Sequence, residues 1–143
     1  MSNIKISPDN KLAAYSIDTV SRRLYTIKIK NLETGEFLND CIDNTSGNFA
    51  WGNDNTTLFY TNRDSETLRN DKIYKHVLGT TSKDDELVFH DKDNTFYTNI
   101  SKSKSNKFIL IASYNTLTSD SPFLNSHTPH YYFYLFIKLQ TAL

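Results

Sequence analysis

Cysteine is nearly absent from this sequence, with Cys41 the single example among 143 residues. A lone cysteine cannot close an intrachain disulfide, and without a C-x-x-C pair it provides no zinc-binding framework. One thiol is typical of a reducing compartment, so we expect a cytoplasmic protein. The opening residues, MSNIKISPDN, also lack the apolar stretch of a secretory signal peptide.

Net charge and long apolar runs are lacking as well. Lys+Arg and Asp+Glu number 16 each, which gives a formal net charge of zero. This balance argues against electrostatic capture of nucleic acid or of an anionic membrane. The longest apolar run, Tyr131–Ile137, is far shorter than the roughly 20 residues that a membrane-spanning helix needs. We therefore expect neither nucleic acid nor membrane as a partner.

Glycine is too sparse for a serine-hydrolase nucleophile elbow. That turn takes the form G-x-S-x-G, because side chains in place of the glycines would clash. The glycines here are Gly35, Gly47, Gly52 and Gly79, and no two of them are four positions apart. The serines stand in turn-like segments, where local hydrogen bonding to the backbone is their ordinary role. We expect no catalytic residue in this chain.

A recurring pattern takes the place of these missing features. An apolar residue, a polar turn and an apolar strand follow one another in Ile6–Tyr15, Trp51–Tyr60 and Ile100–Ile111. The strand starts Leu12 and Leu58 are 46 positions apart, and Phe108 follows Leu58 by 50. Spacings of about 40–50 residues are typical of the four-stranded blades of a β-propeller.

A second landmark repeats with a similar period. The alternating segment Leu24–Lys30 predicts a strand that buries Tyr25, Ile27 and Ile29. Its counterpart in the next unit starts at Lys72, 48 positions after Leu24. The remaining expected strands are Leu12–Ile17, Phe37–Ile42, Leu58–Thr61, Lys72–Leu78, Glu86–His90, Thr95–Ile100, Phe108–Ser113 and Tyr131–Ile137.

These patterns predict an all-β chain without a second domain. We expect a partial β-propeller of about two and a half to three four-stranded blades, an incomplete ring. The blade units are placed at approximately residues 4–48, 49–94 and 95–143. The third unit lacks a hairpin partner for its last strand within the sequence.

The histidines give no clear sign of chemistry. His76 and His90 stand in strand-like runs and are expected to be satisfied surface or edge residues. A triad of His76, Asp71 and a nearby serine stays open, although nothing in the pattern favours it. His127 and His130 have a spacing that suits a metal only on a helix, which the neighbouring proline argues against. We expect no metal and no cofactor.

Clusters of charge are also interpreted as surface features. Asp84–Glu86 precedes a strand and is expected to be a solvated turn rather than a calcium site. Arg22–Arg23 and Lys102–Lys104 fall on predicted loops, where charge is ordinary. None of the three is taken as an interaction patch.

The amino-acid sequence of several blade segments resembles that of a known family. SPDNKLAAYSIDT, YTIKIKNLETGE, NTSGNFAWGNDNTTLFYT and FYTNISKSKSNKFILIASYNTLTS are similar, in order and without large gaps, to the N-terminal β-propeller of oligopeptidase B in the prolyl oligopeptidase family. The likeness runs from about Ile4 to Leu124 and thins afterwards. It implies a serine peptidase in which a propeller filters substrates by size and covers an α/β-hydrolase domain that cleaves short peptides after basic residues.

Three hypotheses follow from this resemblance. The first is a truncated propeller portion that is inert alone, because the α/β-hydrolase domain is absent from the sequence. The second is one half of a split or frameshifted peptidase that needs a separately encoded hydrolase domain. The third is a non-catalytic interaction module. Whether the chain counts as an enzyme is left open, and no triad residue of the family is carried onto it.

An incomplete ring also carries a physical cost. Blades bury their faces against neighbours, and terminal repeats normally have polar capping faces. Tyr131–Ile137 combines high β propensity with no charge, which is an aggregation hazard when unpaired. We expect marginal stability and self-association.

Overall fold

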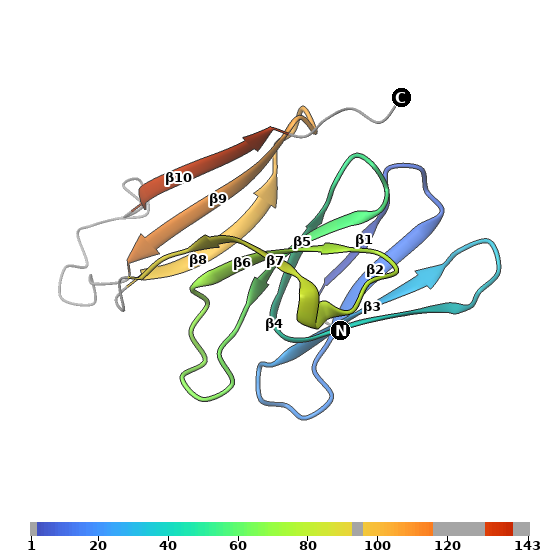
Figure 1. Ribbon diagram of the computed structural model, residues 1–143, viewed down its shortest axis with the longest axis horizontal. Helices are drawn as coiled ribbons and strands as arrows, with labels where there is room; N and C mark the ends of the chain where they lie inside the picture. Colours follow the sequence, from blue (N-terminus) through green and yellow to red (C-terminus); the bar gives the residue numbers. More distant parts are fainter. Residues whose placement is uncertain (1–2, 93–95, 116–130, 139–143) are drawn as a thin grey trace.

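The computed structural model describes residues 3–92, 96–115 and 131–138 of the chain. These residues form antiparallel strands in two sheets, one in the order β1-β2-β3-β4-β5-β6-β7 and one in the order β10-β9-β8 (Figure 1). A short 3₁₀ helix, η1 (Ser82–Asp84), precedes β7. The strands are β1 (Asn3–Ile6), β2 (Leu12–Ile17), β3 (Tyr25–Asn31), β4 (Phe37–Trp51), β5 (Thr57–Asn62), β6 (Lys72–Val77), β7 (Glu86–His90), β8 (Phe96–Lys102), β9 (Phe108–Asn115) and β10 (Tyr131–Lys138).

The long strand β4 belongs to two blades. Its first part pairs with β3, with Ile42 opposite Ile27, and its second part pairs with β5, with Phe49 opposite Tyr60. Thr45 lies at the change of partner, opposite both Tyr25 and Asn62. Positive φ angles at Asn44 (57°) and Gly47 (91°) flank it and bend the strand there.

The seven-stranded sheet is therefore two four-stranded blades. Blade 1 comprises β1, β2, β3 and the first part of β4, and blade 2 comprises the second part of β4 with β5, β6 and β7. Blade 3 comprises β8, β9 and β10. The inner strand of blade 2, which is the second part of β4, lies beside β1 of blade 1 and β8 of blade 3, as inner strands do in a propeller.

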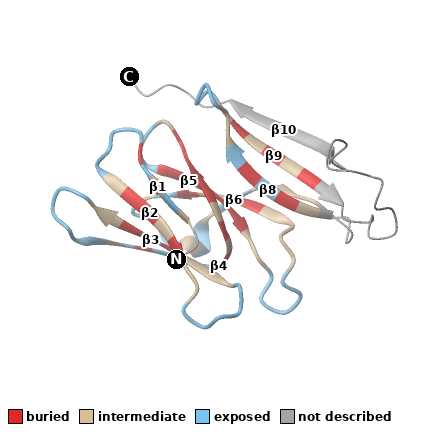
Figure 2. Cartoon of the chain, turned by 180° about the vertical axis from the view of Figure 1, so that it is seen from behind, coloured by how far each residue is buried: buried red, intermediate tan, exposed pale blue. Residues whose placement is uncertain are grey.

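Alternating side chains of blade 2 fill two separate cores. Phe49, Trp51 and Leu58 face blade 1, where they pack against Ile27 and Ile29. Ala50, Phe59 and Ile73 of blade 2 face blade 3 instead. They form a second cluster with Ile100, Ile109 and Ile111 of blade 3. Because both faces of blade 2 are covered, most of β5 is buried (Figure 2).

The all-β prediction is confirmed, with two revisions. Ile27 and Ile29 are fully buried as expected, whereas Tyr25 is half-buried. The strand expected to end at Ile42 continues to Trp51 through the polar segment NTSGN. Asn, Ser and Gly have low strand propensity, but pairing with β3 and β5 holds this segment extended.

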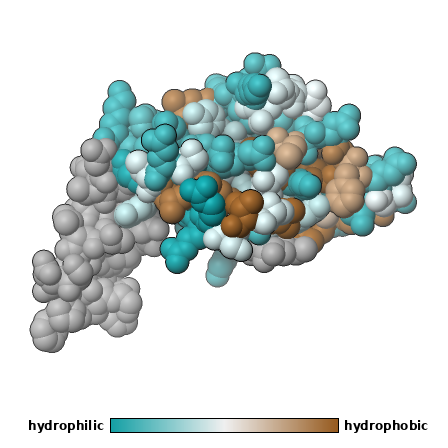
Figure 3. All heavy atoms as spheres, turned by 90° about the horizontal axis from the view of Figure 1, so that it is seen from below, coloured by the Kyte–Doolittle hydropathy of each residue, from teal (hydrophilic) through white to brown (hydrophobic). Residues whose placement is uncertain are grey.

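The outer surface is mixed in character. Polar side chains lie over much of the face seen in Figure 3, with apolar patches between them. Exposed apolar residues include Ile4 and Ile6 of β1, at 55% and 45% exposure. Among the described residues, no helix has the length and apolar character needed to cross a membrane.

Candidate functional site

Three turns of equal geometry connect the first two strands of each blade. We call them the blade turns: Ser7–Leu12, Gly52–Thr57 and Ser103–Phe108. In each, the first N–H donates to the last carbonyl, at 2.8, 2.7 and 2.9 Å respectively. Each also holds an asparagine in the left-handed conformation, with φ of 62° at Asn10, 63° at Asn55 and 59° at Asn106. Asparagine tolerates this region better than most residues, which explains its recurrence.

Side chains inside the blade turns accept the remaining backbone hydrogen bonds. Asp9 accepts from the Ser7 hydroxyl at 2.6 Å and from the Lys11 N–H at 3.0 Å. Asp54 accepts from the Thr57 hydroxyl at 2.7 Å and from two backbone N–H groups. The hydrogen bond from Ser7 is the main cause of a lowered pKa at Asp9. Burial alone would raise the pKa of Asp54, but its combined hydrogen bonds hold it below the ordinary value.

The blade turns are also bonded to one another. The Asp9 N–H donates to Asn55 Oδ1 at 2.8 Å, which joins blade 1 to blade 2. Asn53 Nδ2 donates to the Asn106 carbonyl at 2.6 Å, which joins blade 2 to blade 3. The repeated motif therefore brings three distant segments together at one end of the blades.

A cavity of about 430 Å³ opens among these turns, and we call it the turn cavity. Blade 1 supplies Lys5 and Ser7, blade 2 supplies Trp51, and blade 3 supplies Lys102 and Asn106. Trp51 Nε1 donates to the Lys5 carbonyl at 2.9 Å. None of the residues that line the turn cavity is acidic.

The two lysines of the turn cavity differ in how they are held. Lys5 Nζ donates to the Phe49 carbonyl at 2.7 Å and lies 5.6 Å from the centre of the Phe49 ring. Burial lowers its pKa. Burial and repulsion from Lys5 lower the pKa of Lys102. In the described part of the chain, neither ammonium group is paired with a carboxylate.

A second polar cluster lies between blades 1 and 2, centred on His76 of β6. His76 Nε2 is 2.7 Å from Asp40 Oδ2 on β4, and Nδ1 is 2.7 Å from Asp85 Oδ1. The Tyr60 hydroxyl also donates to Asp85 at 2.7 Å, and the Gly79 N–H donates to Asp40 at 2.9 Å. Burial and the Asp85 carboxylate raise the pKa of Tyr60 far above its usual range.

This cluster joins blade 1 to blade 2, because Asp40 lies on β4 of blade 1 and His76 lies on β6 of blade 2. The expectation of a surface or edge histidine at position 76 is wrong, because His76 is fully buried. Both of its ring nitrogens are occupied by carboxylates, so it has no nitrogen free to accept a proton from a serine. In the described residues, no serine hydroxyl is hydrogen-bonded to a histidine.

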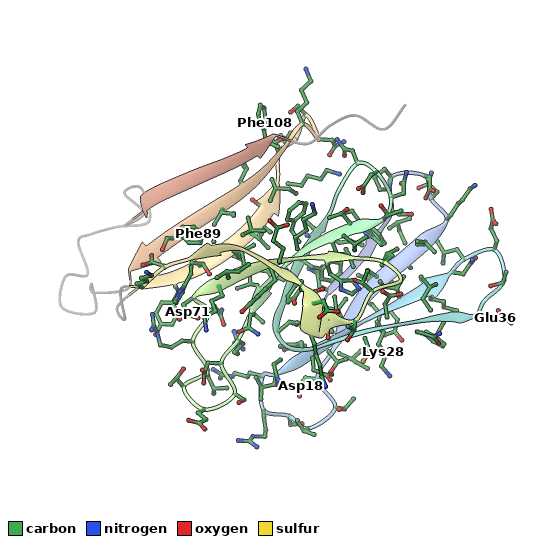
Figure 4. The ribbon with its side chains drawn as sticks, in the orientation of Figure 1. Asp18, Lys28, Glu36, Asp71, Phe89 and Phe108 are labelled. Atoms are coloured by element: carbon green, nitrogen blue, oxygen red, sulfur yellow. The ribbon has the colours of Figure 1, made fainter. Side chains whose placement is uncertain are left out.

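The triad considered from the sequence is not assembled. Asp71 immediately precedes β6, at the opposite end of the blades from Phe108 (Figure 4). Its carboxylate is 3.4 Å from His90 Nε2 and 3.9 Å from Arg69 Nη1. Asp71 is therefore a partner of His90, the other strand histidine, and not of His76. His127 and His130 lie outside the described residues.

The charge clusters divide into buried and exposed members. Asp84 and Glu86 are exposed as expected, but Asp85 is wrongly assigned to a solvated turn, because its side chain is 2% exposed. Its partner His76 belongs to the same β6–β7 hairpin, nine positions earlier in the chain. Their closeness therefore follows from the hairpin that the sequence predicts. Asp40 comes from another blade and no local signal marks it. No group of three or more His, Cys, Asp or Glu side chains that could hold a metal ion occurs in the residues that the structure describes.

The remaining charged or nucleophilic candidates are held in turns or on strand edges. Arg22 and Arg23 are exposed, and their backbone N–H groups donate to the Asp18 carboxylate. Lys104 is exposed in a turn, but Lys102 ends β8 and lines the turn cavity, contrary to its expected loop position. Partial desolvation and Asp43 raise the pKa of the Cys41 thiol, which disfavours a thiolate nucleophile.

Comparison with known proteins gives one consistent relationship. The chain matches the model of the prolyl oligopeptidase N-terminal β-propeller domain over residues 1–138. It is 45% identical over 116 residues, 81% of the chain, to dipeptidyl aminopeptidase BI from Pseudoxanthomonas mexicana, and 36% identical over 127 residues, 87% of the chain, to Protease 2 from Moraxella lacunata. Oligopeptidase B from Leishmania major superposes with a TM-score of 0.75 at 26% identity over 95% of the chain.

These relatives are much longer than this chain. The matched regions make up 16% and 18% of the two sequence relatives and 20% of the Leishmania structure. The blades described above therefore correspond to one part of those proteins. Both the family match and the three-blade arrangement confirm the partial propeller expected from the repeats, and the chain belongs to the prolyl oligopeptidase family, as a portion of its N-terminal β-propeller domain.

Proposed function

We propose that this chain serves as a substrate-gating portion of a prolyl oligopeptidase-family serine peptidase. The carrying observation is the match of residues 1–138 to the family's propeller domain. In this role the blades limit the size of the peptides that reach a separate α/β-hydrolase domain, and short peptides are the substrates of the whole enzyme. Similarity to oligopeptidase B supports cleavage after basic residues.

The chain alone is proposed to be catalytically inert. Its sequence contains no G-x-S-x-G elbow, and His76 is fully engaged by Asp40 and Asp85. Activity then depends on an α/β-hydrolase domain as partner, including one that is encoded separately. The scarcity of cysteine supports a cytoplasmic location.

A chimera tests the gating role. Residues 1–138, which match the family's propeller domain, replace the corresponding segment of dipeptidyl aminopeptidase BI, which is 45% identical to this chain over 116 residues. We expect the chimera to hydrolyse a short chromogenic peptide and to leave a folded protein of the same local sequence uncut. A chimera that folds but cuts the folded protein as readily as the short peptide would overturn the proposal.

A control separates folding from gating. The same chimera carrying Lys104→Met, a change at an exposed turn residue, should match the unsubstituted chimera in its activity on the short peptide and on the folded protein. The parent enzyme with the segment deleted should lose the discrimination or fail to accumulate. Cytoplasmic location is checked by fractionation of cells that express the chain with a C-terminal tag.

A further inference from the structure

The turn cavity has the electrostatic character of a site for an anionic group. Lys5 and Lys102 reach it from different blades, and no residue that lines it carries a negative charge. Of the acidic residues in the neighbouring blade turns, Asp9 and Asp54 are both engaged by hydrogen bonds within their own turns. The two ammonium groups therefore meet no neutralising carboxylate in the described residues.

Burial makes this arrangement costly without an anion. Desolvation disfavours both ammonium groups, and the repulsion between them adds to the effect at Lys102. A bound anion would offset both effects, since charge-assisted hydrogen bonds strengthen as water is excluded. Lys5 Nζ is held by the Phe49 carbonyl, whereas the ammonium group of Lys102 makes no hydrogen bond within the described residues and stays available to a ligand.

The size and polarity of the turn cavity restrict the chemical class of ligand that it can hold. A volume of about 430 Å³ lies at the lower end of small-molecule pockets and suits one or two amino-acid residues rather than a folded partner. The exposed side-chain amide of Asn106 lines the same cavity and can bond a peptide backbone, whereas the Ser7 hydroxyl and Asn53 Nδ2 are already engaged by Asp9 and by the Asn106 carbonyl. Trp51, which is 3% exposed, also lines the cavity.

We propose that the turn cavity binds the C-terminal carboxylate of a short peptide between Lys5 and Lys102. This proposal rests on the gating function above, because it places a peptide terminus at the inner strands of the blades. Its consequence is a preference for peptides with a free C-terminus over amidated ones, set by the propeller and not by the catalytic domain.

Tryptophan fluorescence of the purified chain measures this binding directly. Trp51 is the single tryptophan of the sequence and lines the cavity, so a bound peptide should change its emission. The probes are tri-alanine, tri-alanine amide and sodium acetate. We expect saturable binding of tri-alanine, at least tenfold weaker binding of the amide, and weaker binding of acetate because it lacks a peptide backbone.

Variants link the signal to the lysine pair. Lys102→Met should weaken tri-alanine binding at least tenfold, Lys102→Arg should retain it, and the exposed turn control Lys104→Met should leave it unchanged. Equal far-UV circular dichroism spectra establish that each variant is folded. Equal affinity for acid and amide, acetate binding as tight as that of the peptide, or an unaltered Lys102→Met variant would each overturn the proposal.

The outcome is separable from that of the gating proposal. The fluorescence titration uses this chain without a catalytic domain, whereas gating is measured by the chimera's activity. A chimera that discriminates by size without any carboxylate preference would remove the binding site and leave the gating function intact.

Discussion

Removal of the His76 side chain should destabilise the chain strongly, because it leaves two buried carboxylates without the imidazole ring that both of them contact. The side chains of Asp40 and Asp85 are 5% and 2% exposed, and that of His76 is 0% exposed. Removal of one partner that leaves a buried charged group uncompensated typically costs about 3–5 kcal/mol. We therefore expect His76→Ala to lower the free energy of unfolding by about that amount.

Urea denaturation followed by Trp51 fluorescence measures the loss. With an m-value of about 2 kcal/mol per molar urea, a destabilisation of this size moves the midpoint down by roughly 2 M. Total stabilities of domains are about 5–15 kcal/mol, so the variant is expected to be partly unfolded even without urea if the chain is at the lower end. A stabilising salt such as sulfate then restores the folded baseline and allows the comparison.

Two further variants test the reasoning. His90→Ala is the matched control, because its side chain is 30% exposed and lies 3.4 Å from Asp71, so we expect a cost below about 1 kcal/mol. His76→Phe fills the space but donates no hydrogen bond, and it should be nearly as unstable as His76→Ala. A stable His76→Phe, or equal losses at positions 76 and 90, would refute the role assigned to the two carboxylates.

Three other features of the blades give measurable expectations. The pKa of Asp54 is lowered in the folded state from its usual 3.8, so its contribution to folding stability is present above about pH 4 and is lost as the pH falls through the folded value. Asp54→Asn should therefore lose less thermal stability than the unsubstituted chain between about pH 6 and pH 3. An equal loss in both proteins would contradict this. Asn10 has a φ of 62°, so Asn10→Ala should cost about 1 kcal/mol in urea denaturation while Asn10→Gly is nearly neutral, and equal costs would rule out backbone strain. β10 pairs with β9 at the edge of its sheet, and an edge strand can pair with another chain. Size-exclusion chromatography should therefore show self-association that increases with protein concentration. A monomer with a cooperative melt at all concentrations would argue against an exposed edge.

The blade pattern was predictable from sequence because its signals are local. Alternation in Leu24–Lys30 identifies the buried Ile27 and Ile29, and the recurring polar turns set the blade period. The left-handed asparagines occupy the same place in all three blade turns, and this repetition is visible in the printed sequence once the turns are aligned.

Contacts between blades were not predictable in the same way. Asp40 and His76 are 36 positions apart, and Lys5 and Lys102 reach one cavity from blades 1 and 3. No periodicity within a strand specifies which residue of the next blade it will meet. The extension of β4 through NTSGN was missed for a related reason, since its strand conformation depends on pairing with β3 and β5 rather than on its own propensity.

We propose that this chain contributes propeller blades and carries no catalytic centre of its own. The most direct measurement incubates the purified chain with a fluorophosphonate label for active serines and with a short peptide whose C-terminal arginine carries a chromogenic amide as the leaving group. We predict no labelled serine and no turnover above that of a heat-denatured sample. Stoichiometric labelling of one serine, with saturable turnover that disappears when that serine is replaced by alanine, would contradict the account.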